Sequence, residues 1–237
     1  MIRVKLTLIL AIFISQFLFA QANVSRMGFK FGAAGGYGKM FIFNNADNLN
    51  LALRQNNFPE IKNGILASAG GGYFYTMFVK NLRFGGFAFS GSNSESIKEN
   101  SFEKETVINA SGGGFTVEYT FSFVKKIGTS IGIMLGGGST SINLYKNDGN
   151  LIWPQNIVSE TKINTELTNT YFLITPIINV EIPFSRFIAL RAGVGYNIKV
   201  NSEWKFDNGK SISNIDNNLD GDNLFLQLGI YVGFFAF

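Results

Sequence analysis

The stretch that decides the fold is the end of the chain, LFLQLGIYVGFFAF, from Leu224 to Phe237. Its even positions are all apolar: Leu224, Leu226, Leu228, Ile230, Val232, Phe234 and Ala236. Its odd positions are mixed: Phe225, Gln227, Gly229, Tyr231, Gly233, Phe235 and Phe237. Because side chains alternate across a β-strand, one face is wholly apolar and the other partly polar. This pattern favours a strand that lies between lipid and a polar lumen.

The start of the chain predicts a secretory signal peptide over residues 1–22. Arg3 and Lys5 form a basic start, residues 6–19 are almost wholly apolar, and Ala20-Gln21-Ala22 offers a cleavage site after Ala20 or Ala22. A retained anchor helix is the alternative, but the apolar run falls short of the about 20 residues that a spanning helix needs. We therefore expect one domain over residues 23–237.

The composition narrows the class of protein. Without the two cations of the signal, 18 of the 20 Lys and Arg residues remain against 16 acids, so the net charge falls from +4 to about +2. This balance, with no dense basic run, argues against a nucleic-acid partner. The chain has no cysteine, yet it is rich in glycine and aromatic residues and poor in charge. High apolar content without a long apolar run after the signal is typical of a membrane-spanning barrel.

The alternation predicts eight strands joined by short and long connections in turn. The strands are expected at 28–43, 64–78, 82–92, 107–123, 127–144, 170–183, 187–200 and 224–237. The short connections are 79–81, 124–126 and 184–186; the long polar ones are 44–63, 93–106, 145–169 and 201–223. We therefore predict an all-β fold, an eight-stranded antiparallel up-and-down transmembrane β-barrel with short periplasmic turns and long extracellular loops. Both ends of the barrel should then lie on the periplasmic side.

The strand faces also predict the turns. In strands 170–183 and 187–200 the even positions are mainly apolar, so paired residue numbers should sum to an even value. That requires an odd number of loop residues, three at 184–186 and three at 124–126. Three glycine triplets, at 70–72, 112–114 and 136–138, blur the pattern elsewhere. In a small barrel such glycines allow bends and leave lumen space for large neighbours.

Charged side chains are expected on the lumen face, because a Lys or Arg in mid-bilayer lipid costs about 2–4 kcal/mol. The candidates for a lumen polar network are Lys30, Glu118, Glu181, Arg191 and Lys199. If residue 182 pairs with 188, Asn179 lies opposite Arg191 and Glu181 lies one diagonal step away. Such charges can fill and rigidify an eight-stranded lumen, which is just wide enough for side chains. Alternatively, exchange of Glu–Arg pairs opens a gated water path.

One loop segment resembles half of a calcium loop. Asp216, Asn218 and Asp220 have the D-x-N-x-D-G spacing, but the twelfth position is Gln227 instead of the bidentate Glu. The alternative is an Asn/Asp turn cluster in a solvated loop. No cofactor is expected.

An enzyme is disfavoured because the chain contains no histidine. A Ser or Asp nucleophile without His needs another base, and no convincing Ser–Lys pair is present. Zinc and haem sites that depend on His or Cys are likewise unsupported.

The first long connection carries apolar residues among asparagines. Residues 46–55 can form a short helix that caps the barrel mouth, or the exposed apolar side chains can mark a partner site. Aromatic residues near the strand ends, among them Tyr171 and Trp204 at the loop end, suggest two membrane-interface girdles.

With its signal, eight alternating strands and closing segment, the chain resembles the small outer-membrane barrels typified by OmpA's membrane domain and OmpX. The resemblance implies a monomer in bacterial outer-membrane lipid, with Tyr231, Phe235 and Phe237 in a signal read by the barrel-assembly machinery. In that family the strongest apolar positions share parity with the last Phe, whereas here they have the other parity.

Three function classes remain open at this stage. The first is a structural, adhesive or surface-interaction protein that acts through its extracellular loops, with a surface or host molecule as ligand. The second is a small channel or carrier for a small or apolar solute. The third is a soluble secreted ligand-binding barrel, which requires an apolar inside and a polar outside.

Overall fold

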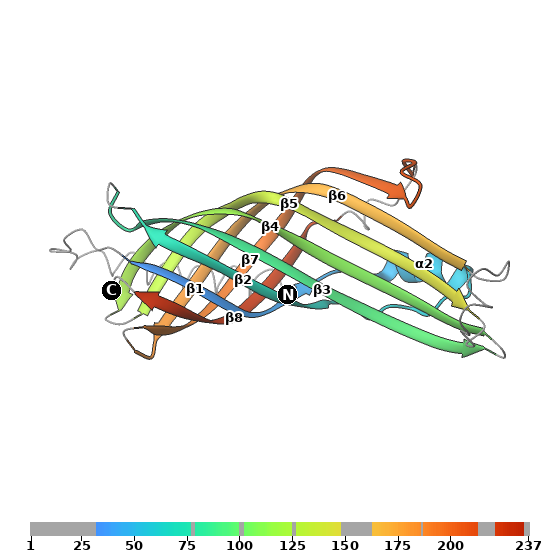
Figure 1. The fold of residues 1–237 in the computed structure, drawn as a ribbon, viewed down its shortest axis with the longest axis horizontal. Coiled ribbons are helices and arrows are strands. Elements are labelled where there is room, and N and C mark those ends of the chain that lie inside the picture. Colours follow the sequence, from blue (N-terminus) through green and yellow to red (C-terminus); the bar gives the residue numbers. More distant parts are fainter. Residues whose placement is uncertain are drawn as a thin grey trace, which may run out of the picture.

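The computed structural model describes residues 32–76, 79–99, 102–124, 127–147, 163–185, 187–212 and 221–234. Eight antiparallel strands close into one barrel in the order of the sequence (Figure 1). The strands are β1 (Ala33–Phe43), β2 (Ile65–Tyr75), β3 (Leu82–Glu99), β4 (Phe102–Val124), β5 (Ile127–Asn147), β6 (Ile163–Pro183), β7 (Ile188–Phe206) and β8 (Asn223–Phe234). One helix, α2 (Asp47–Gln55), lies between β1 and β2. The predicted fold class is confirmed, and β1 begins and β8 ends at the same end of the barrel.

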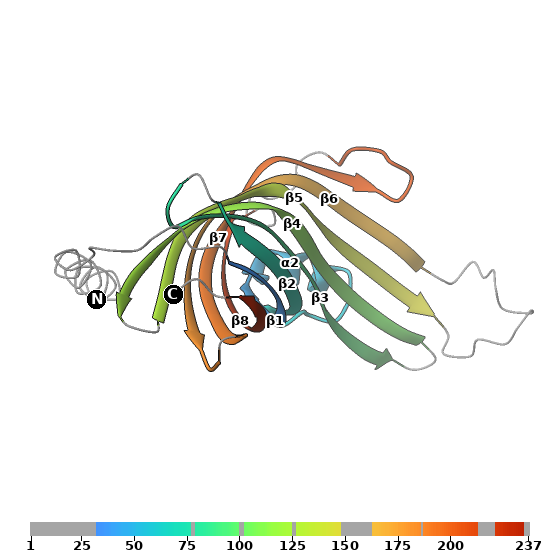
Figure 2. The same ribbon diagram turned by 60° about the vertical axis from the view of Figure 1, so that its left-hand side comes forward.

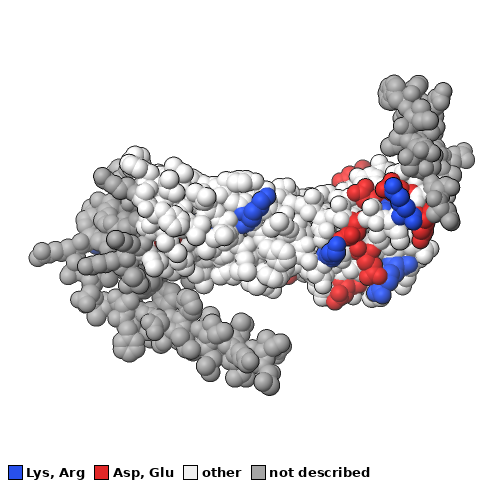
Figure 3. All heavy atoms as spheres, turned by 90° about the horizontal axis from the view of Figure 1, so that it is seen from below, with Lys and Arg blue, Asp and Glu red and all other residues white. Residues whose placement is uncertain are grey.

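The barrel wall separates apolar from polar side chains as the alternation predicts. Leu228 and Val232 of β8 are more than half exposed on the outer surface, as is Phe172 of β6. Glu118 and Arg191 point inward and are 3% and 5% exposed. The interpretation as a soluble secreted barrel is therefore wrong. Figure 3 shows a broad, sparsely charged band on the face seen from below, with most of the acidic and basic side chains gathered toward one end.

Helices do not provide the membrane span: within the described ranges, none is both long and apolar enough to cross a bilayer.

Several strands continue farther at the loop end than the alternation predicted. Residues 93–106, expected as a long loop, continue the β3–β4 ladder from Ser92↔Asn109 to Glu99↔Phe102. β6 and β7 likewise begin and end beyond the predicted limits. The sequence pattern missed these extensions because both faces of a strand outside the membrane can be polar. In Figure 2 these strands flare away from the shorter β1, β2 and β8.

The β6–β7 turn confirms the predicted parity but corrects the register. The Phe184 amide donates to the Ile188 carbonyl at 2.9 Å, so three residues, 185–187, form the turn. Ile182 pairs with Leu190, and Glu181 lies directly opposite Arg191. The expected 182–188 pairing was therefore wrong by two residues. Because side chains alternate with a period of two, this shift leaves every side chain on its predicted face.

The prediction of a three-residue turn between β4 and β5 was wrong. The last pair is Val124↔Ile127, which leaves two residues between the paired positions. The register shifts between Phe121 and Val124, and below that irregularity Phe121 pairs with Thr129. A β-bulge thus absorbs the extra residue, so the strand bodies keep an even sum and their predicted faces.

Inward glycines make room for large lumen side chains. A Cβ at Gly112 of β4 would lie 2.8 Å from the ring of Phe89 and 2.9 Å from Leu173. The predicted reason for the glycine triplets is therefore confirmed at this position, where two buried side chains occupy the space that a larger residue would need.

The segment 44–64 folds across the barrel mouth and carries α2. Leu49 and Leu53 are buried in the same apolar cluster as the lumen residues, whereas Leu51 is half exposed. Thr106 donates to the Pro59 carbonyl at 3.0 Å, and Asn93 donates to the Lys62 carbonyl at 2.9 Å. The predicted short helix is confirmed, and its apolar residues divide between packing on the lumen and exposure at the cell surface.

Candidate functional site

Two cross-strand ion pairs face each other near the turn end of the lumen. On β3 and β4, Arg83 lies opposite Glu118, with Nη2 2.7 Å from Oε2. On β6 and β7, Glu181 lies opposite Arg191, with Oε1 2.8 Å from Nη1. The barrel closure brings these two pairs together from distant parts of the sequence.

Each arginine also bonds the carboxylate of the other pair. Arg83 Nη1 lies 2.9 Å from Glu181 Oε1, and Arg191 Nη2 lies 2.6 Å from Glu118 Oε1. All four side chains are nearly fully buried. Two guanidinium groups and two carboxylates leave no net charge, which is the arrangement that makes buried charge tolerable.

Neighbouring polar groups complete this charge cluster, defined as Arg83, Glu118, Glu181 and Arg191. Tyr73 donates to Glu181 at 2.9 Å, and Ser130 donates to Glu118 at 2.7 Å. Arg83 also stacks on the Tyr73 ring, 4.1 Å from its centroid. Among the buried side-chain atoms that the structure describes, Arg191 Nε alone has no hydrogen-bond partner. Because nearly all polar side-chain atoms of the cluster have hydrogen-bond partners, we expect the cluster to be rigid.

A buried apolar layer follows the cluster toward the mouth. Phe87 and Phe225 stack with their ring centroids 6.5 Å apart, and Met40 and Met134 are fully buried at inward positions. Beside Arg191 the described part of the lumen holds two cavities of only about 10 Å³ each. That is about the space of one water-sized sphere. Side chains therefore fill the lumen both at the charge cluster and at the apolar layer.

The sequence analysis identified three of the four charges in this cluster. Glu118, Glu181 and Arg191 meet there, whereas Lys199 lies nearer the mouth, its Nζ 4.9 Å from the centroid of the Tyr171 ring. Lys30 lies outside the described residues. Arg83 was missed. It shares parity with Phe87 and Phe89, and the cost of an outward arginine was the signal that could have placed it inside.

The remaining sequence candidates are only partly visible. Asp216, Asn218 and Asp220 lie outside the described ranges, within which no cluster of acidic side chains could hold a metal ion. Tyr231 points inward, where the guanidinium carbon of Arg191 lies 5.1 Å from its ring centroid. Phe235 and Phe237 also fall outside the described part of the chain.

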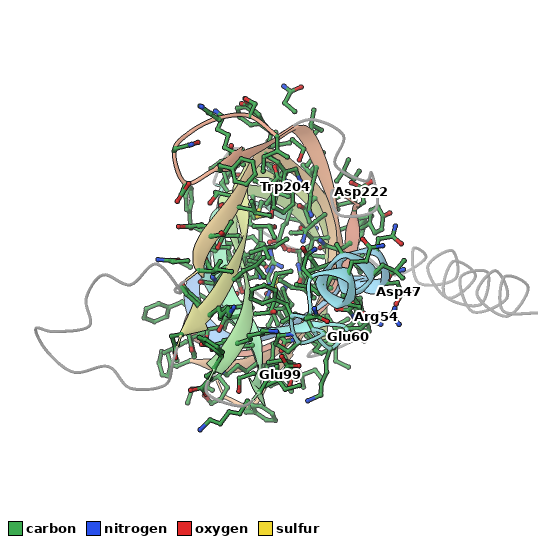
Figure 4. The ribbon with its side chains drawn as sticks, turned by 90° about the vertical axis from the view of Figure 1, so that its right-hand side faces the viewer. Asp47, Arg54, Glu60, Glu99, Trp204 and Asp222 are labelled. Carbon is green, nitrogen blue, oxygen red and sulfur yellow. The ribbon has the colours of Figure 1, made fainter. Side chains whose placement is uncertain are left out.

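Charged residues lie at the mouth, where Figure 4, an end-on view, labels several on the side of α2. Asp47 and Arg54 belong to α2, Glu60 to the segment that follows it, and Glu99 to the end of β3. On β7, hydrogen bonds from Lys205 and Ser211 lower the pKa of the exposed Glu203 carboxyl. Trp204 and Tyr171 are buried, so their expected place in an interface girdle was wrong.

One exposed cation lies among the apolar side chains of the outer wall. Lys39 of β1 has an outward position, and its Nζ donates to Ser68 of β2 at 3.1 Å. Tyr37 donates to the same hydroxyl at 2.8 Å. A lysine that faces lipid destabilises the barrel by an amount that depends on its depth in the bilayer.

The apolar outer wall, the filled polar lumen and the closed ring of eight strands together decide the class of protein. The chain is an integral outer-membrane β-barrel. No protein-family model matches it, and no curated protein matches it.

Solved structures with a similar fold include several that are distant in sequence. Neisserial surface protein A is 11% identical, with a TM-score of 0.40, and the match covers 85% of this chain and 95% of that one. Ail, the attachment invasion locus protein of Yersinia pestis, in complex with the heparin analogue sucrose octasulfate, is 9% identical, with a TM-score of 0.44 and coverage of 88% and 100%. OprG from Pseudomonas aeruginosa is 8% identical, with a TM-score of 0.43 and coverage of 87% and 97%. Likeness at this level concerns the fold alone.

Proposed function

We propose that this barrel is a surface-interaction protein whose folded loop end binds a protein partner outside the cell. The observation that carries the proposal is the extension of β3–β7 beyond the other strands, with segment 44–64 folded against it. Side-chain hydrogen bonds and two buried leucines hold this segment in place. A prefolded surface of this kind binds with less loss of conformational entropy than a mobile loop.

The filled lumen supports this proposal over a channel. A conducting path has to pass both the apolar layer and the charge cluster, and the cavities seen there beside Arg191 have a volume of only about 10 Å³ each. Four mutual ion contacts make the cluster costly to open, because a separated buried charge loses its partners.

The charges at the loop end favour a protein over a polyanion as partner. Basic described residues there are Arg54, Lys62, Lys98, Lys104, Lys146, Lys199, Lys205 and Lys210. Acidic ones are Asp47, Glu60, Glu95, Glu99, Glu103, Glu105, Glu166, Glu203, Asp207 and Asp222. A polyanion site needs an excess of cations, whereas mixed signs provide complementarity to a protein surface.

Adhesion of cells that display the barrel tests this proposal. The surfaces are coated with matrix proteins, with heparin or with albumin, and cells that lack the barrel are the baseline. We expect adhesion to at least one matrix protein, and none above baseline to heparin. The double charge reversal Arg54→Glu/Lys62→Glu should reduce adhesion, because both side chains are exposed and their ion pairs to Glu60 and Glu95 contribute little to stability.

The matched control reverses one exposed charge at the opposite end of the barrel, Lys80→Glu in the β2–β3 turn. It should leave adhesion unchanged while surface amounts of all variants stay equal. Adhesion no greater than that of cells without the barrel, on every protein coat, would contradict the proposal. Equal adhesion of the double reversal and the wild type would place the binding surface elsewhere.

A further inference from the structure

A cavity of about 210 Å³ lies at the loop end of the lumen, above the apolar layer. Its apolar lining includes Ile42, Phe89, Ile108 and Leu173, all nearly fully buried. None of the four residues of the charge cluster lines the cavity. Because the lumen is filled beneath it, the cavity is a dead end and not part of a pore.

The cavity reaches the outside of the barrel on one side. Asn45, just before α2, and Asp222, just before β8, both line it and are exposed. In Figure 4, Asp222 lies at the mouth on the same side of the barrel as Asp47 of α2. Among the described residues, the cavity is therefore open on the side of α2 and the start of β8, at the loop end of the barrel.

The polar part of the lining is held in place by its own contacts. Tyr171 and Thr140 share a hydrogen bond of 3.0 Å. Asn197 accepts from Thr175 at 2.9 Å and donates to Asn223 at 2.8 Å. Side chains with fixed positions lose little entropy when a ligand binds, so this wall is preorganised.

Lys199 provides the cation of the cavity. Its Nζ lies 4.9 Å from the centroid of the Tyr171 ring, and both residues line the same cavity. A lysine next to amide and hydroxyl donors, above an apolar floor, is complementary to an anion with an apolar body. Asp222 accepts from the Lys199 backbone amide at 2.9 Å and lies at the exposed rim, where water and salt screen its charge.

We propose that this cavity binds a small molecule with one carboxylate and an apolar body of about one ring. The size follows from the volume: an apolar cavity of about 150 Å³ is large enough for benzene, and 210 Å³ leaves room for an attached carboxylate. In this arrangement the ring lies against Leu173 and Ile108, and the carboxylate meets Lys199.

Benzoate is the probe, and titration calorimetry of the full barrel in lipid nanodiscs is the measurement. We expect a saturable heat with one site. Lys199→Gln should weaken binding about tenfold or more, because it removes a charged hydrogen-bond donor. Lys205→Gln, on the same strand but outside the cavity lining, is the matched control and should bind benzoate like the wild type.

A second variant tests the location independently of charge. Ala110→Leu places a larger side chain into the lining and should abolish the heat while the barrel still shows folded gel mobility. Benzyl alcohol and benzylamine, which match benzoate in size, should bind at least tenfold more weakly. The proposal is overturned by an absence of saturable heat with the wild type, by equal binding of benzoate to the folded Ala110→Leu variant, or by tighter binding of benzylamine.

Discussion

Replacement of Arg83 by Met should be among the most destabilising single changes in the lumen. Arg83 is 1% exposed and bonds two carboxylates, Glu118 through Nε and Nη2 and Glu181 through Nη1. Without it, two buried carboxylates share the single guanidinium of Arg191. Loss of one partner from a buried ion pair costs about 3–5 kcal/mol, and we expect Arg83→Met to fall in that range.

The double variant Arg83→Met/Glu118→Gln separates net charge from packing. It removes one whole cross-strand pair and leaves Glu181 with Arg191, which still face each other at 2.8 Å. The remaining cluster is neutral. The free energy of unfolding of the double variant should therefore be closer to that of the wild type than the sum of the two single changes predicts. A coupling of about 1–3 kcal/mol is expected for directly bonded residues.

Urea unfolding of the barrel in lipid vesicles provides these free energies, with tryptophan fluorescence and gel mobility as two independent signals. Equal denaturant midpoints for Arg83→Met and wild type would refute the argument that the cluster depends on balanced charge. If the changes in unfolding free energy of the two single variants add up to that of the double variant, the pairing of Arg83 with Glu118 is refuted.

Three further outcomes follow from the same structure. In planar bilayers neither the wild type nor Arg191→Ala should show steady openings, because the apolar layer remains; long-lived openings of the wild type would mean that the lumen conducts. Leu49→Ala/Leu53→Ala should cost about 2–5 kcal/mol per leucine in the packing of segment 44–64 and speed its proteolysis, whereas Leu51→Ala, half exposed, should leave the cleavage rate unchanged. Lys39→Leu should raise the free energy of unfolding by up to about 2 kcal/mol in vesicles, since it removes a lipid-facing charge; a loss of stability would show that its bond to Ser68 matters more.

Within the membrane the alternation of the sequence was sufficient to find the strands, and to assign their faces where glycines do not blur it. Leu228 outward and Arg191 inward both follow from it, because lipid on one side and a crowded lumen on the other impose a strict period of two. The same rule failed for residues 93–106, where both strand faces lie outside the membrane. It also missed the bulge between Phe121 and Val124, which changes a turn without changing any face.

The charge cluster shows how much of the candidate site the sequence could reveal. Glu118, Glu181 and Arg191 were placed in the lumen from parity alone, but parity does not say at which height each side chain lies. Arg83 was absent from that set because the glycines on either side of it in the chain blur the pattern of β2 and β3. Height along the barrel depends on strand register, and register depends on turn lengths and bulges that differ by one or two residues.

By itself the sequence determined the membrane-spanning barrel and its inside and outside, because alternation is a local property of each strand. Only the tertiary structure decided that Arg83 and Glu118 meet Glu181 and Arg191, and that segment 44–64 lies over a cavity at the mouth. These features depend on how far each strand is shifted against its neighbours when the ring closes. The contacts that result join residues about 100 positions apart, such as Arg83 and Glu181, and no local pattern records them.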